Sequence, residues 1–416
     1  MEKNKILFLM FLSLFIGYLP WYNYSAVMPY ISKEFCFTSA QEGLIVSAFQ
    51  LGYVLVVLIT GYLADKMGPK KIVAWATLCT AIFASVFVFV AKDFWSTLIM
   101  RLLTGLSAGA IYAPGMSLLA NWFPARERGK AMGAYTAGLV ASYAGGYFIA
   151  SPLAAAFSWR VGMLATSLPV FLAAGLVFMF VQEKPQEKAQ FDGAPECVGG
   201  RTILPAPEGG YMGPILLTGS YMGHMWELYA FWGYIGSFMM ACCIHHGIQA
   251  SVGGLLAAVI IMVGAPAVYI MGIIADKWGR TKAIIISATA SLLPEFFFGY
   301  MLDAPLWATI AVGLWMGFWV IADSAIYKAG LTDMISDEVR CTILGVQSAV
   351  GFSMTVLAPV AFGTLLGYLN KGVPTVEATV WGPCFVMLGI GAILSPLLAF
   401  VTRKTAQAKL MTGGKM

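Results

Sequence analysis

A few titratable residues stand inside long apolar stretches of the chain. His224 and Glu227 are three positions apart, which places them on one face of a helix, one turn apart. Asp323 and Arg101 lie within other apolar stretches. A charge at the centre of a bilayer costs about 2.5–3.5 kcal/mol on insertion scales and usually faces a cavity or a partner. These four residues are therefore our first candidates for substrate binding or ion coupling.

The spacing of His224 and Glu227 suggests proton chemistry. Burial should raise the proton affinity of the carboxyl, and a neighbouring imidazole could share or pass that proton. Tyr221 is one turn earlier on the same face and joins them as a candidate. The alternative is a hydrogen-bonded pair that only holds helices together.

Asp323 belongs to a stripe of residues at every fourth position, with Trp315, Trp319 and Tyr327. Aromatic rings beside a carboxylate could bind a cation or form one wall of a gate. The alternative is a stripe that faces lipid or packs against other helices. Asp323 and Trp319 enter the candidate site on this argument.

Arg101 and Tyr22 complete the candidates outside the C-terminal half. Arg101 lies near the end of its apolar stretch, where it could attract an anion or take part in coupling. The alternative for Arg101 is a side chain that reaches to the membrane surface. Tyr22 stands in a Tyr- and Trp-rich stretch of the first apolar segment and is a candidate for stacking on a ligand.

The composition identifies the class of protein. Of the 416 residues, 59% are hydrophobic and 11% are charged, and the mean hydropathy is +0.79. A soluble domain carries about 25% charged residues, so this chain cannot cover a water-facing surface. A soluble enzyme, a disordered protein and a nucleic-acid binder are excluded, and an integral membrane protein remains.

Long apolar runs predict an all-α protein with twelve membrane-spanning helices rather than a barrel. The predicted spans are 5–31, 41–64, 70–91, 94–119, 129–152, 160–181, 213–241, 249–275, 281–302, 305–328, 342–368 and 379–402. Most of the 25 Lys and Arg residues fall on one side, which predicts cytoplasmic termini. We expect a multi-pass protein of the plasma membrane, and the bacterial cytoplasmic membrane in particular.

The chain also divides into two related halves. A polar stretch at 182–212 predicts a cytoplasmic linker between an N-terminal six-helix bundle, 1–181, and a C-terminal one, 213–402, followed by a tail at 403–416. The sequence GYLADKMGPKK, from Gly61, is echoed by GIIADKWGRTK, from Gly272, at an offset of 211 residues. The same offset makes Tyr112 the counterpart of Asp323, so Tyr112 joins the candidate site.

Twelve spans, a central linker and this duplicated Gly-x-x-x-Asp-Lys-x-Gly loop resemble the major facilitator superfamily of transporters. The resemblance implies two six-helix bundles around a central cavity that alternate between two openings. It also implies a conformational latch, formed by Asp65, Lys70, Arg128, Asp276 and Arg280. Arg101 stands in RLLTGLSAG, which resembles the motif of span four, with Thr104 where Gln is common.

We therefore expect a secondary transporter, not an enzyme, that moves a small metabolite such as an organic anion with protons. We expect a functional monomer in the lipid bilayer, with no cofactor and no nucleic-acid partner. Proton-driven efflux of drugs is one alternative, although the glycine-rich stretch 138–146 of the fifth span lacks the proline common in such proteins. Uptake of a soft metal such as copper is another, because Cys242, Cys243, His245 and His246 cluster at the end of one span. That cluster matches no standard metal site.

Overall fold

The structure is a computed structural model that describes residues 2–123, 125–183, 210–335 and 340–414. Within these ranges the chain forms α-helices and short 3-10 helices. The α-helices are α1 Glu2–Gly17, α2 Asn23–Phe35, α3 Ser39–Met67, α4 Pro69–Val90, α5 Phe94–Ala108, α6 Tyr112–Trp122, α7 Ala125–Ala156, α8 Trp159–Ser167, α9 Pro169–Phe180, α10 Met212–His245, α11 Ala250–Met262, α12 Gly264–Trp278, α13 Arg280–Phe298, α14 Leu306–Ala322, α15 Ser324–Met334, α16 Arg340–Leu369, α17 Gly382–Ala392 and α18 Leu394–Thr402. The 3-10 helices are η1 Met301–Asp303, η2 Thr375–Glu377 and η3 Gln407–Gly414.

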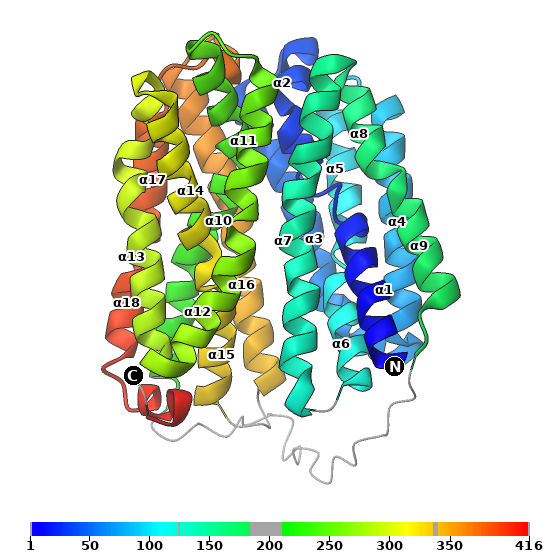
Figure 1. The fold of residues 1–416 in the computed structure, drawn as a ribbon, viewed down its shortest axis with the longest axis vertical. Coiled ribbons are helices and arrows are strands. Elements are labelled where there is room, and N and C mark those ends of the chain that lie inside the picture. Colours follow the sequence, from blue (N-terminus) through cyan, green and yellow to red (C-terminus); the bar gives the residue numbers. More distant parts are fainter. Residues whose placement is uncertain (1, 124, 184–209, 336–339, 415–416) are drawn as a thin grey trace, which may run out of the picture.

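These helices build the predicted twelve spans. Eleven segments of the described chain are long and apolar enough to cross a membrane. The remaining predicted span, 5–31, is present as the two shorter helices α1 and α2. Figure 1 shows that α1 to α9 form one bundle of six spans and that α10 to α18 form the other. Most of the predicted linker, 184–209, lies outside the described residues.

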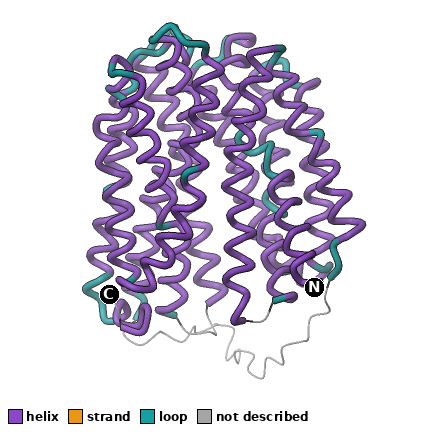
Figure 2. Tube along the Cα trace, viewed as in Figure 1, coloured by secondary structure: helices purple, strands orange, loops and turns teal. Residues whose placement is uncertain are grey.

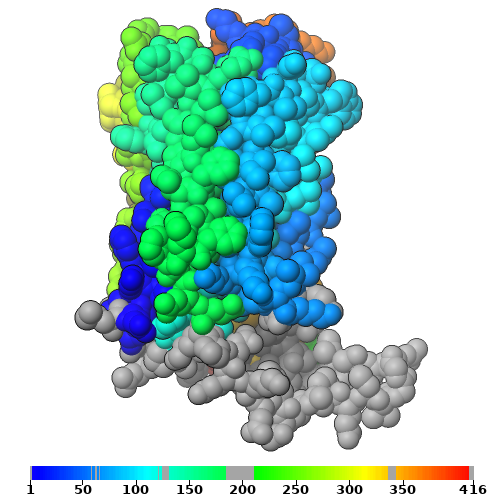
Figure 3. All heavy atoms as spheres, turned by 90° about the vertical axis from the view of Figure 1, so that its right-hand side faces the viewer, coloured from blue at the N-terminus to red at the C-terminus, as the bar shows by residue number. Residues whose placement is uncertain are grey.

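Both termini lie at one end of the molecule, which we call the termini end, and we call the opposite end the far end (Figure 1). On the outer face of the first bundle, α9 lies between α1 and α4, and it packs against both (Figure 3). The termini share an end because the number of spans is even, which agrees with the predicted topology.

Several spans are broken into two helices, and Figure 2 shows short loops within the bundles at some of these places. Pro20 lies in the break between α1 and α2, and Pro169 begins α9. Proline lacks the amide hydrogen that a continuous helix needs, so it ends or kinks a helix. The break between α14 and α15 contains no proline. It falls at Asp323, between Ala322 and Ser324.

The duplicated loop folds in the same way in both halves. Gly68 joins α3 to α4 with a φ of 89°, and Gly279 joins α12 to α13 with a φ of 105°. Each glycine amide donates to a carbonyl four residues earlier, at 2.9 Å for Ala64 and 3.0 Å for Ala275. A positive φ strains any residue with a side chain, so these turns explain the repeated glycine.

The two bundles pack against each other in the half nearest the far end. There α3 contacts α16, α7 contacts α11, and α10 contacts α2. Ser47 donates a hydrogen bond of 2.6 Å to the Val356 carbonyl across this seam, and Tyr147 donates one of 2.9 Å to the Trp232 carbonyl. The close approach depends on Gly43, where an added Cβ would lie 2.4 Å from the Pro359 carbonyl oxygen. The far end of the molecule is therefore closed.

Candidate functional site

His224 on α10 and Asp323 form a buried pair at the break between α14 and α15. The His224 Nδ1 atom lies 3.0 Å from Asp323 Oδ1, and both side chains are 2% exposed. The other ring nitrogen, Nε2, lies 2.6 Å from the Ser324 hydroxyl. Both nitrogens of His224 are therefore engaged by the broken span. The predicted direct pairing of His224 with Glu227 is wrong in this conformation, because that break supplies closer partners.

A hydroxyl network extends the pair toward neighbouring helices. The Tyr327 hydroxyl donates to Asp323 Oδ2 at 3.1 Å and accepts from Ser395 Oγ at 2.5 Å. The Tyr221 ring stacks near the His224 ring, with centroids 5.9 Å apart. The broken helix thus places a carboxylate, an imidazole and two phenols together, a set of groups that can hold and pass a proton.

Lys328, which the sequence left without an assigned role, lies one turn beyond this cluster on α15. Its Nζ atom donates to Ser348 Oγ at 2.7 Å and lies 4.7 Å from the centre of the Tyr221 ring. These two contacts of the ammonium within the described part of the chain, a hydroxyl and an aromatic face, carry no negative charge. Lys328 can therefore attract an anion beside the His224–Asp323 pair.

Glu227 lies one turn along α10 from His224 and faces α13. Ser291 hydrogen-bonds to the Glu227 carboxyl, and Glu295, on the next turn of α13, interacts with it electrostatically. Glu227 is 2% exposed and Glu295 is fully buried. Within the described residues, one oxygen of Glu227 and both oxygens of Glu295 lack a hydrogen-bond partner. Two buried carboxyls that interact with each other cannot both carry a charge at low cost, so the pair is suited to holding a proton.

Arg101 does not reach toward the membrane surface, so that alternative is wrong. Its side chain is 3% exposed and lies against the break in the first span. Nη1 donates to the Pro20 carbonyl at 2.9 Å and Nη2 to the Trp21 carbonyl at 2.8 Å. The guanidinium also stacks over Phe49, at 4.4 Å from the ring centre. Arg101 satisfies carbonyl groups that a continuous helix would have bonded internally.

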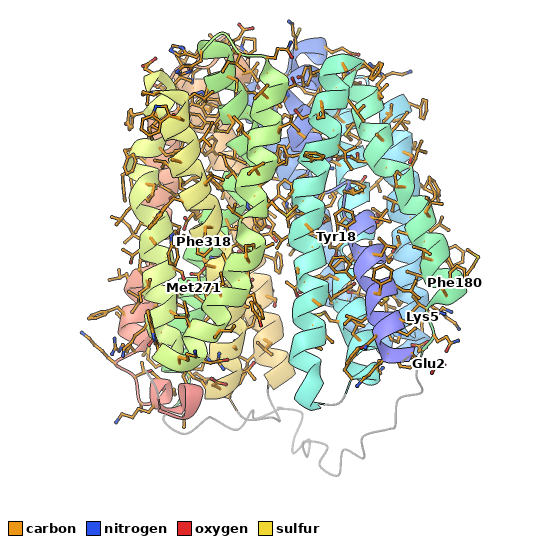
Figure 4. All side chains as sticks on the ribbon, in the orientation of Figure 1. Glu2, Lys5, Tyr18, Phe180, Met271 and Phe318 are labelled. Carbon is orange, nitrogen blue, oxygen red and sulfur yellow. The ribbon has the colours of Figure 1, made fainter. Side chains whose placement is uncertain are left out.

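Tyr22 lies in an aromatic cluster at the seam between the bundles. Its ring centroid is 5.0 Å from that of Tyr143 and 5.9 Å from that of Trp232. Trp21 packs against Tyr53 at 4.6 Å, and Tyr53 contacts Phe352 of the second bundle at 5.5 Å. Figure 4 places Tyr18, at the start of the same break, near mid-height in the molecule. Aromatic rings from both bundles therefore meet close to the middle of the membrane.

Two other candidates lie apart from these groups. Tyr112 bonds to Thr136 at 2.8 Å and stacks on Tyr135 within the first bundle. Trp319 contacts Trp315, and the Trp315 indole donates to the Ala290 carbonyl on α13. Because the helix breaks at Asp323, the predicted stripe does not continue as one face. The contacts of Trp319 are those of a packing residue.

The latch residues are partly described. Arg280 lies between Asp276, 3.3 Å from Nη1, and Asp333 of α15, 2.5 Å from Nε. This ties the second loop to the termini end of the broken span. Lys70 is half-buried at the start of α4. The side chains of Asp65 and Arg128 lie outside the described residues.

The Cys and His cluster at the end of α10 is dispersed. Cys242 and Cys243 are buried in the helix, His245 pairs with Asp303 at 3.0 Å, and His246 bonds to the Cys242 carbonyl at 2.9 Å. In the described part of the chain, no group of three or more His, Cys, Asp or Glu side chains is arranged to hold a metal. The geometry gives no support to soft-metal capture there.

One cavity of about 350 Å³ opens between α1, α7 and α11. Its lining is apolar and includes Phe15, Phe148 and Met262. Phe148 is 62% exposed and Met262 42% exposed, so the cavity opens on the face that meets lipid tails. It is separate from the polar groups described above.

The sequence missed several residues that the structure brings into the seam. Tyr143, Trp232 and Phe352 are ordinary aromatic residues in apolar runs, and no spacing distinguishes them. Glu42 is buried at the start of α3, although in the sequence it is an acidic residue near a predicted helix end, where acids are common. These residues are recognisable only from contacts between the two bundles, which the spacing of residues within one span does not reveal.

Three comparisons with known proteins bear on the family and the fold of this chain. The family model of the Major Facilitator Superfamily matches residues 10–245, which is more than half of the chain. The hexuronate transporter of Bacillus subtilis is 32% identical over 186 residues, covering 45% of this chain and 44% of that protein. The chain therefore aligns with less than half of that relative's length.

Two solved structures share the fold over nearly the whole chain. One is a bacterial homolog to the human lysosomal transporter Spinster, in an inward-facing and occupied conformation, with a TM-score of 0.76, 15% identity and 97% of each chain covered. The other is a D-xylose-proton symporter, with a TM-score of 0.74, 15% identity, and 97% of this chain and 99% of that one covered.

Proposed function

This chain belongs to the Major Facilitator Superfamily, and from that premise we propose that it moves a small organic anion across the membrane by proton-coupled alternating access. The observation that carries the proposal is the buried His224–Asp323 pair, in hydrogen-bond contact at 3.0 Å. A buried pair of this kind is costly and marks a functional site inside a membrane.

The anion is assigned from two features. Lys328 presents a positive charge whose neighbours are a hydroxyl and the Tyr221 ring, so an incoming carboxylate would compensate it. The relative from Bacillus subtilis is a hexuronate transporter, and hexuronates are sugar carboxylates. Tyr221 and the aromatic cluster around Tyr22 would stack against the apolar face of such a substrate.

Proton coupling is assigned to the second bundle. The His224 ring and the Asp323 carboxylate lie in hydrogen-bond contact, so the pair can take part in proton transfer. Glu227 holds a proton beside Ser291 and Glu295 when the site is dry, and loses it when water enters. The substrate site at Lys328 and the proton site at His224 share Tyr221 as a neighbour, so both can bias the same two-state movement of the bundles.

The positive residues of the loops support cytoplasmic termini. On that topology the closed far end is the outer face. We propose a monomer in the bacterial cytoplasmic membrane, with the latch residues Asp276 and Arg280 steadying the inner end of α15. Uptake and efflux use the same groups and differ in the gradient that drives them.

Purified protein in liposomes with a radiolabelled hexuronate tests the proposal. An inward proton gradient should drive accumulation, and Glu227→Gln should reduce accumulation to the level without a gradient while leaving exchange of labelled for unlabelled substrate. Glu377→Gln, an exposed carboxyl in η2, is the matched control and should behave as wild type. Normal accumulation by Glu227→Gln would end the coupling assignment.

Lys328→Gln tests the anion assignment separately. It should raise the KM for a hexuronate at least tenfold, since a lost charge-assisted contact costs about 1.5–3 kcal/mol. The KM for a neutral hexose that the wild type also accepts should change little. An equal rise for both solutes would show that Lys328 only supports the fold.

A further inference from the structure

A buried carboxyl lies in the seam that closes the far end. Glu42 is on the first turn of α3, which Thr38 caps by accepting a hydrogen bond from the Gln41 amide. Glu42 is fully buried. The Thr375 hydroxyl of η2, in the other bundle, donates to Glu42 Oε2. This contact therefore joins residues 333 positions apart and exists only while the two bundles are together at this end.

Hydrogen bonds link two hydroxyl groups and the Glu42 carboxyl across the same seam. Ser39 Oγ lies 2.9 Å from Thr375 Oγ1. Thr375 has one hydroxyl hydrogen, which goes to Glu42, so Ser39 donates to Thr375. The Glu42 Oε1 atom has no hydrogen-bond partner among the described residues, and the same is true of Ser32 Oγ, which is a polar neighbour of this carboxyl. A carboxyl hydrogen on Oε1 would satisfy both groups.

Among the residues that the structure describes, no cationic side chain contacts the Glu42 carboxyl. The titratable side chains that face it are phenols, Tyr24 of α2 and Tyr234 of α10. The guanidinium of Arg101 on α5 stacks on Tyr24 and bonds to carbonyls, and Glu377 of η2 is exposed. A charged Glu42 would therefore be buried without a cationic partner, which is strongly unfavourable.

We propose that Glu42 is a proton-binding site of the far-end gate, occupied by a proton when the bundles are closed there and emptied when they separate and water reaches it. The proposal rests on alternating access, and it adds a proton site separate from Glu227 and from the His224–Asp323 pair. Since the closed gate binds this proton more tightly, acid on the far side closes the gate and alkali opens it.

The sign and size of the effect follow from linkage. One titrating group can change the ratio of closed to open molecules by at most about tenfold for each pH unit. Glu42→Gln supplies a neutral side chain of the same size that still accepts from Thr375. The gate of this variant should therefore stay closed at every pH.

Distances between spin labels on the two bundles measure gate opening without a substrate. Lys92 and Lys371 are exposed at the far end, one in each bundle, and would be changed to cysteine for labelling. The background would lack reactive native thiols. Cys36 has a φ of 57°, so asparagine, which tolerates that conformation, is the replacement there.

Wild-type protein in nanodiscs should show a growing long-distance population as pH rises from acid to alkaline, and Glu42→Gln should lose this response. Glu34→Gln is the matched control, because Glu34 lies at the same end but pairs with Arg160 within the first bundle; it should keep the response. A response that persists in Glu42→Gln, or that is lost in Glu34→Gln, would overturn the proposal.

Gly43→Ala separates failure of this proposal from failure of alternating access. Its added Cβ would press on the Pro359 carbonyl at 2.4 Å and should open the gate at any pH. If Gly43→Ala opens the gate but a change of pH does not open it in the wild type, Glu42 is not the proton site of the gate. If neither opens it, the alternating-access premise falls as well, and the proposal with it.

Discussion

At the scale of single residues, Arg101 shows how a buried charge can serve the backbone. Its two terminal nitrogens bond to the consecutive carbonyls of Pro20 and Trp21, and aromatic rings cover its plane. The planar fork of a guanidinium can meet two acceptors at once, whereas an ammonium is a single point of charge. Arg101 thus holds the break of the first span open and keeps Trp21 and Tyr22 at the seam.

We predict that Arg101→Lys lowers the free energy of unfolding by about 1.5–3 kcal/mol, the range for losing a hydrogen bond to a charged group. A thermal-unfolding assay in detergent would measure the loss. Because the role is to position the backbone, the remaining transport of charged and neutral solutes should fall in parallel. A selective loss of carboxylate transport would instead make Arg101 a direct ligand of the substrate.

At the scale of elements, the breaks within spans place polar groups and backbone carbonyls in the interior of the bundles. The break at Asp323 frees a carboxylate and a hydroxyl to meet His224. The duplicated turns work differently, because Gly68 and Gly279 adopt the left-handed half of backbone space and begin the next helix at once. The break at Asp323 and the two glycine turns each fix the angle between consecutive helices. That angle determines which sides of the helices pack against each other.

We predict that Gly68→Ala and Gly279→Ala each cost about 1–2 kcal/mol, the penalty for a side chain at a positive φ. Gly272→Ala is the control, since Gly272 lies inside α12 and an added Cβ would meet nothing within 4 Å. It should be neutral or stabilising, because alanine favours a helix. Thermal unfolding of the three variants would measure these changes in stability. An equal loss of stability in all three would contradict the role assigned to the positive φ of Gly68 and Gly279.

At the scale of the whole molecule, the seam at the far end joins two bundles, and the proposed alternating access requires this contact to separate. It depends on small residues that let backbones approach, notably Gly43 opposite Pro359 and Gly363 opposite Ser39. Small residues at helix contacts are the usual means of close packing in membranes. Any added volume there should favour the conformation in which the seam is open.

We predict that Gly43→Ala moves the gate equilibrium about five- to 150-fold toward the open far end, since overpacking a tight contact costs about 1–3 kcal/mol. The same spin-label distance would report it, and uptake should slow because the closed state forms less often. Gly345→Ala, at a position where an added Cβ has open space, should leave both unchanged. A gate that stays closed in Gly43→Ala but still opens with pH would show that the seam absorbs the added methyl group elsewhere.

Much of the fold follows from the sequence, and less of the site does. Apolar length and loop charge predict the spans closely; for example, the predicted 213–241 is observed as Met212–His245. His224 and Asp323 are recognisable one by one as costly polar residues. Their pairing is not, because they are far apart in the chain and meet through a break that no proline or glycine marks. Glu42 was missed because its partner Thr375 belongs to the other bundle.

The seam of the far end has a further consequence for how the protein meets its surroundings. In the described residues of that half, hydroxyls, carbonyls and aromatic rings join the bundles, and the ion pairs Glu34–Arg160 and His245–Asp303 each lie within one bundle. Dissolved salt weakens interactions between exposed charges by screening, but it has little effect on buried hydrogen bonds and ring contacts. The gate should therefore open and close alike in dilute and in saline media, so that acidity and the solute, rather than ionic strength, govern its position.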